Sequence, residues 1–163
     1  MDNTFVLEGE NFKLSLTFQV FESDIAYPTN TIISVFVLSA EFSASTSMDV
    51  DIKQISEFCN ELNKLYSTLK GSTKILEPFG NKQSICFSGD GLGHIHISGT
   101  LHSNGADGLW QELKFENSID QTYFPKFITE LTSYVKQFLL NMGCTHSLNV
   151  NPFFAKKRTH FAK

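Results

Sequence analysis

Cysteine is scarce in this sequence, and the few cysteines form no metal-binding pattern. The chain of 163 residues holds three of them, Cys59, Cys86 and Cys144, with no C-x-x-C spacing. A zinc site needs closely spaced pairs, and an odd number suits reduced thiols in a reducing compartment. We therefore expect buried free thiols, with no disulfide framework and no metal bound by cysteine.

Long apolar runs are also missing. No stretch approaches the roughly 20 consecutive apolar residues that cross a bilayer, and the apolar stretch at 31–40 (TIISVFVLSA) is typical of a buried strand. The first residues, MDNTFVLEGENFK, lack the basic and then apolar order of a secretory signal. These absences predict a cytoplasmic protein with no membrane partner.

Motifs for covalent and phosphate chemistry are absent as well. No serine lies in the G-x-S-x-G pattern of a nucleophile elbow. The glycine-rich stretch GDGLGH at 89–94 precedes a strand pattern, whereas a dinucleotide-binding loop leads into a helix, so we expect a hairpin turn there. Cys86 lies inside an apolar strand, which favours an inert thiol. We therefore expect no catalytic residues, no cofactor and no enzyme.

Charge is unevenly distributed along the chain. Four of the 13 basic residues lie after residue 143, where there is no acid, so residues 1–143 hold 9 basic and 17 acidic side chains, a net charge of −8. An acidic body argues against a nucleic-acid partner and favours a basic protein partner. We expect one α+β domain over 1–143 and a basic, phenylalanine-containing tail over 144–163. The tail pattern FFAKKRTHFAK can bind nucleic acid through charge and stacking, but we expect its rings to dock on the domain.

Periodicity predicts strands and two helices. Residues 12–20 alternate apolar and polar side chains, which is typical of a strand with one buried face, and a second strand runs from Thr31 toward Phe42. After a polar link at 43–49, apolar residues from Ile52 to Leu69 recur at helical spacing. Three further strand patterns lie at 84–88, 94–102 and 109–115, with a short piece near 75–76. Apolar residues at 124–142 again have helical spacing.

Local signals predict where the helices begin and end. Asp49 or Asp51 can cap the first helix, and Gly71 supplies a left-handed residue after it. Thr122 can cap the second helix, with Pro125 in its first turn. Two helices with one apolar stripe each must bury that stripe against a sheet. We therefore expect an α+β fold, with an antiparallel sheet of about five to six strands and both amphipathic helices packed on one face.

The stretch GHIHISGTLH at 93–102 places three histidines at even positions of one strand. We expect this strand to pair with the next one so that the numbers of opposed residues sum to about 212. This register sets His96 opposite Glu116 and His102 opposite Trp110. His94, His96 and Glu116 could then hold a metal, but two histidines and an acid are also typical of a solvated polar face. We favour the polar face and expect no metal.

Three segments carry a resemblance to a known family. They are residues 41–71, 93–101 and 113–131, the last with Asp120-Gln121-Thr122-Tyr123 at the head of the final helix. In these segments the chain resembles the WapI-like bacterial immunity proteins. The resemblance implies an α+β protein without catalytic residues that binds and neutralises a cognate toxin, such as a nuclease, in the cytoplasm of the producing cell. An acidic body suits a basic toxin.

Under that interpretation, the toxin binds the polar face of the sheet and its loops, and the predicted partner-binding residues are His94, His96, Trp110, Glu112 and Glu116. Buried aromatic anchors and complementary charges commonly dominate interface energy. Two other function classes stay open. A different ligand- or protein-binding module should show a closed apolar pocket, and a metal-dependent enzyme should use the His94 and His96 strand.

Overall fold

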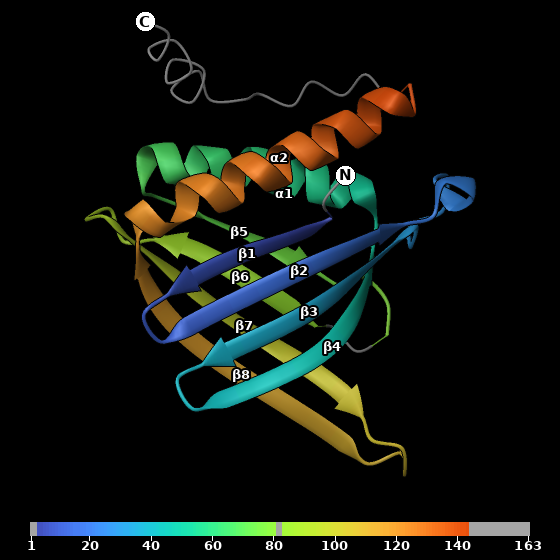
Figure 1. Cartoon of the computed structure of the whole chain (residues 1–163), viewed down its shortest axis with the longest axis horizontal. Helices are drawn as coiled ribbons and strands as arrows, with labels where there is room; N and C mark the ends of the chain where they lie inside the picture. The colour runs from blue at the N-terminus through green and yellow to red at the C-terminus, as the bar shows by residue number, and fades with distance from the viewer. Residues whose placement is uncertain (1–2, 81–82, 144–163) are drawn as a thin grey trace, which may run out of the picture.

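The computed structural model describes residues 3–80 and 83–143. These residues form two antiparallel four-stranded sheets and two α-helices (Figure 1). The tail expected at 144–163 lies outside the described residues, so its docking stays a prediction. The first sheet, in the order β1-β2-β3-β4, contains β1 (Thr4–Gly9), β2 (Phe12–Val20), β3 (Thr31–Ser39) and β4 (Phe42–Val50). The second, in the order β5-β6-β7-β8, contains β5 (Ser72–Leu76), β6 (Ser84–Gly89), β7 (His94–Asn104) and β8 (Trp110–Asp120).

Strand β2 confirms the alternation that the sequence predicts. Its residues Phe12, Leu14, Leu16 and Phe18 are buried, and the residues between them are only half-buried. Leu14 lies opposite Val37 of β3, so the same face of both strands is apolar. This face forms one wall of the core.

The expected single sheet of about five to six strands is wrong, because the described residues form eight strands in two sheets. The stretch at 43–49, expected as a polar link, belongs to β4, which pairs with β3 along its whole length. Most side chains of this strand are small and polar, so it lacks the apolar alternation from which strands are predicted. They are tolerated because most of them point to the solvated side of an edge strand.

Both helices pack between the two sheets, not on one face of a single sheet. The rings of Phe58 in α1 (Ile52–Thr68) and Phe127 in α2 (Phe124–Asn141) lie 5.5 and 6.5 Å from that of Phe87 in β6. Tyr134 of α2 packs on Phe5 of β1, with ring centroids 5.3 Å apart. Figure 1 shows both helices beside β1 and β5, where they cover one end of the two crossing sheets.

Helix α1 begins as expected and ends differently. The side chain of Asp51, one of the two expected caps, accepts a hydrogen bond of 2.9 Å from the Lys53 amide. The left-handed residue that ends the helix is Leu69, with φ of 55°, and Gly71 two residues later also has a positive φ, of 93°. The Leu69 carbonyl accepts a hydrogen bond from the Gly91 amide at 2.7 Å, which helps to fix this strained conformation.

Helix α2 is entered through a short 3-10 turn, η2 (Gln121–Tyr123), that the sequence did not predict. The expected cap at Thr122 is wrong, because the Thr122 amide is itself capped by the Asp120 side chain at 2.9 Å. Pro125 lies in the first turn of α2, as expected. Within the described residues, neither helix has the length and hydropathy needed to span a membrane.

Candidate functional site

The β7–β8 hairpin carries all five residues predicted to bind a partner. Odd-numbered residues such as Ile95 and Ile97 are buried in the core, so the even-numbered residues point to the outer face of the second sheet. The face assignment made from the sequence is therefore right. The predicted partner-binding residues share that outer face: His94, His96, Trp110, Glu112 and Glu116.

The predicted register of this hairpin is wrong by two residues. His96 lies opposite Ser118 and not Glu116, and His102 lies opposite Glu112 and not Trp110. The cause is the position of the turn at 105–109, one residue later than expected. There the Gly105 amide donates to the Leu109 carbonyl at 2.9 Å.

Glycine allows the turn to form at this position. The Gly108 amide donates to the Gly105 carbonyl at 2.8 Å, and Gly108 has φ of 76°, a left-handed conformation that suits glycine. Asn104 and Trp110 are then the last opposed residues of the hairpin. The hairpin therefore carries Leu109 and Trp110 at its tip.

The tip exposes two apolar side chains beside a buried histidine. Leu109 is 61% and Trp110 51% exposed, whereas His102 is only 8% exposed. The ring of Trp110 lies against that of His102, with centroids 4.4 Å apart. A large aromatic ring held in place by a neighbour and still accessible is a suitable anchor for a protein interface.

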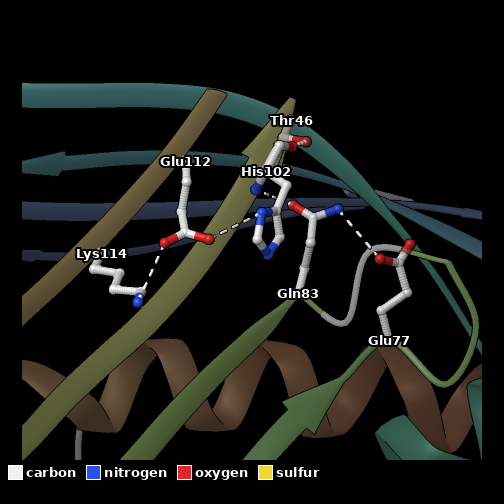
Figure 2. A network of polar contacts seen from close by, with 6 residues as sticks. All are labelled: Thr46, Glu77, Gln83, His102, Glu112 and Lys114. Atoms are coloured by element: carbon white, nitrogen blue, oxygen red, sulfur yellow. Dashed lines mark hydrogen bonds and ion pairs between the residues drawn. The ribbon is translucent and has the colours of Figure 1, made fainter. Parts of the chain in front are cut away.

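Glu112 lies between this histidine and Lys114 (Figure 2). Oε2 of Glu112 lies 3.4 Å from Nδ1 of His102, and Oε1 of Glu112 lies 3.2 Å from Nζ of Lys114. The contact to His102 has ion-pair distance but not hydrogen-bond geometry, so Nδ1 has no hydrogen-bond partner among the described residues.

Gln83 connects the hairpin to the first sheet. Its Oε1 accepts a hydrogen bond from the His102 amide at 3.0 Å, and its Nε2 donates to the Ser47 carbonyl of β4 at 2.7 Å. The Thr46 hydroxyl donates to the His102 carbonyl at 2.6 Å. Figure 2 shows Gln83 between His102 and Glu77. These bonds hold the part of the hairpin near its tip against the edge of β4.

Glu77 extends the same network. Its Oε1 accepts from the Asp49 amide at 3.0 Å, and its Oε2 accepts from Nε2 of Gln83 at 3.4 Å. Sequence reasoning missed Gln83 and Glu77, because their partners on β4 lie 36 and 28 positions earlier in the chain. Beside the network, a groove of about 230 Å³ lies between β4 and the hairpin, lined by residues 43–46, 101–103 and 111–113.

His102, Trp110, Glu112 and Lys114 form one cluster on the hairpin. His94 belongs to a second cluster, at the other end of β7. Its Nδ1 lies 3.1 Å from Oδ2 of Asp90, and it is opposed by Asp120 in β8. The Leu92 amide is the main cause of a lowered pKa of Asp90, and the Thr122 amide is the main cause for Asp120, because each donates to the charged carboxylate. Eight residues separate His94 from His102, or about 26 Å along an extended strand.

His96 and Glu116 lie between the two clusters. His96 is half-buried opposite Ser118, and Glu116 is exposed opposite Ser98. The metal site considered at His94, His96 and Glu116 depended on pairing His96 with Glu116, which the observed register rules out. The described residues contain no group of three histidine, cysteine or acidic side chains placed to hold a metal ion.

Comparison with known proteins supports the resemblance noted in the sequence. Curated proteins gave no match. The family model described as the immunity protein WapI-like family matches residues 5–139, a range that contains every helix and strand except the first residue of β1 and the last two of α2. The matched range includes the β7–β8 hairpin and both clusters on it. The chain therefore belongs to the immunity protein WapI-like family.

Proposed function

We propose that this protein is a non-catalytic, cytoplasmic immunity protein that binds a cognate toxin and thereby neutralises it. Membership of the immunity family supports this function. The observation that carries the site is the tip of the β7–β8 hairpin, where exposed Leu109 and Trp110 lie next to Glu112. Interfaces commonly combine a central aromatic anchor with a polar rim.

Charge supports a basic toxin, for example a nuclease. Residues 1–143 carry a net charge of −8. On the outer face of β8, Glu112, Glu116 and Asp120 outnumber the single cation, Lys114. An acidic surface of this kind raises the rate at which a basic partner associates and makes that rate fall with salt. We propose that Trp110 anchors the toxin, while the acids and His94 and His96 surround it.

Co-expression with the product of the adjacent gene tests this proposal. The complex should copurify, and its affinity should fall between about 50 and 300 mM salt because charge contributes to binding. Trp110→Ala should weaken binding by at least about 30-fold, as truncation of an anchor residue typically does. Glu112→Gln should mainly slow association.

Leu140→Ala provides the matched control. Leu140 is 59% exposed and lies near the end of α2, outside the β7–β8 hairpin, so its truncation should leave affinity unchanged. If the Trp110→Ala variant bound the toxin as tightly as the unchanged protein, the toxin would not bind at the hairpin tip. Failure to bind the product of any adjacent gene would contradict toxin neutralisation itself.

A further inference from the structure

Strand β8 forms a long open edge of the second sheet. It has 11 residues and pairs with β7 on one side (Figure 1). At one end of this ladder the Gly105 amide donates to the Leu109 carbonyl, and at the other end the Gln121 amide donates to the Gly93 carbonyl. Hydrogen-bonded pairs alternate along an antiparallel ladder. The odd-numbered residues of β8 therefore bond to β7, and the even-numbered ones direct their amides and carbonyls outward.

Side chains cover outward groups at two other edges but not at β8. On β4, the Ser47 carbonyl and the Asp49 amide are bound by Gln83 and Glu77. On β5, the Leu76 carbonyl accepts from Gln54 at 3.0 Å. For the even-numbered residues of β8, the described parts of the chain supply no such partner to any backbone amide or carbonyl. An uncovered edge of this length is a template for another strand.

We infer that the occupant of this edge is a second copy of the same chain, with the two β8 strands paired antiparallel about Phe115. Only a register that opposes even-numbered residues to even-numbered ones satisfies the outward groups. Pairing about Phe115 does so, and it makes about twelve hydrogen bonds between the subunits. The two second sheets then form one continuous sheet of eight strands.

Charge complementarity favours this register over the registers shifted by two residues. Lys114 lies opposite the partner's Glu116, and by symmetry the same pair forms a second time. A shift of two residues one way would oppose Lys114 to the partner's Lys114, and a shift the other way would oppose two copies of Glu116. Opposed like charges destabilise a strand pair, whereas opposite charges stabilise it. The side chain of Lys114 is 72% exposed and therefore accessible to a partner.

The pairing would also bring the two clusters of the hairpin together. Trp110 would lie opposite the partner's Asp120, which is opposed by the partner's His94 in its own β7. Within one subunit the His94 and His102 ends of β7 are about 26 Å apart, but across the dimer the predicted toxin-binding residues would form one surface. Only this consequence rests on the proposed toxin function, since the strand pairing needs no toxin.

Sedimentation of the full chain without toxin, over a range of concentrations, tests the inference. We expect a monomer–dimer equilibrium. Lys114→Glu and Glu116→Lys should each weaken dimerisation by about tenfold or more, because each creates two like-charge contacts. The double variant should restore it to within about threefold, because the charges are exchanged and not removed. Lys74→Glu on β5, also a strand at the edge of the second sheet, is the control and should have no effect.

Proline at an even position tests the backbone bonds. Ser118→Pro removes an outward amide and leaves the β7 ladder intact, so it should weaken the dimer while Ser118→Ala does not. Circular dichroism and thermal melting confirm that each variant folds. A monomer at every concentration, or a double variant that stays dissociated, would overturn the inference. A dimer that is as stable in the Ser118→Pro variant as in the unchanged protein would also overturn it. If the unchanged protein were a monomer and Ser118→Pro abolished toxin binding, the edge of β8 would bind the toxin and not a second copy. That result would overturn the dimer but not the toxin function.

Discussion

The indole ring of Trp110 covers the imidazole ring of His102, with centroids 4.4 Å apart and planes tilted by 43°. The residues come from neighbouring strands and are diagonal neighbours, because His102 lies directly opposite Glu112. The ring proposed to anchor the toxin therefore also shields a titratable side chain. The contact between these two rings therefore bears on both toxin binding and the stability of the hairpin.

A double-mutant cycle on Trp110 and His102 should show coupling between the two rings. We expect the losses of unfolding free energy caused by Trp110→Ala and His102→Ala to differ from additivity by about 0.5–1.5 kcal/mol, because each truncation removes the same ring contact. Urea unfolding provides the measurement. Leu109→Ala, an exposed neighbour, should change stability by less than about 0.5 kcal/mol. Additive losses would mean that the contact contributes no stability.

Replacing Gln83 should loosen the joint between the hairpin and β4. Gln83→Ala leaves the His102 amide and the Ser47 carbonyl without their partner. Because the amide is buried, we expect the unfolding free energy to fall by about 1–3 kcal/mol. Gln111→Ala, on the exposed part of β8, is the matched control and should be nearly neutral. Equal stability of the two variants would show that the network is dispensable.

Local periodicity was enough to predict several elements. The alternation of β2 and the helical spacing of α1 each report which side of an element faces the core, and that information lies within a few neighbouring residues. The polar outer face of β7 and β8 was predicted for the same reason. The family, too, was recognised from short segments and then confirmed over residues 5–139.

Properties set by distant contacts could not be predicted. β4 lacks an apolar alternation, and it is a strand because it pairs with β3. The register of β7 and β8 depends on the position of one turn, so an error of one residue in the turn moved every opposed pair by two. Gln83 is buried because β4 lies beside it, a contact that its sequence neighbours do not encode. The predicted site residues therefore lie on the predicted face of the sheet, but the residues opposite them differ from those predicted.

Acid should destabilise the protein partly through Asp90 and Asp120. Hydrogen bonds from the Leu92 amide to Asp90 and from the Thr122 amide to Asp120 lower both pKa values from their ordinary 3.8. A lowered pKa in the folded state gives stability that is present above the unfolded value and lost as pH falls through the folded one. Stability should thus decline below about pH 4.

Asp120→Asn isolates one of these contributions. Asparagine keeps an oxygen that can accept from the Thr122 amide, but it does not titrate. We therefore expect a variant of similar stability at neutral pH whose unfolding free energy falls less steeply in acid. Urea unfolding at a series of pH values gives both curves. Parallel curves would show that Asp120 has the same pKa in the folded and unfolded protein.

The thiol of Cys59 should resist alkylation in the folded protein. Burial inside α1 raises the pKa of Cys59 to about 12, with a hydrogen bond to Thr132 opposing the shift, so almost no thiolate is present near neutral pH. Cys86 is only half-buried and serves as the internal control. Iodoacetamide at about pH 8 should label Cys86 before Cys59, and these two thiols should react at similar rates in urea. Mass spectrometry of the digested protein identifies the labelled residue. Labelling of Cys59 as fast as Cys86 without denaturant would mean that the packing of α1 against α2 opens far more often than global unfolding.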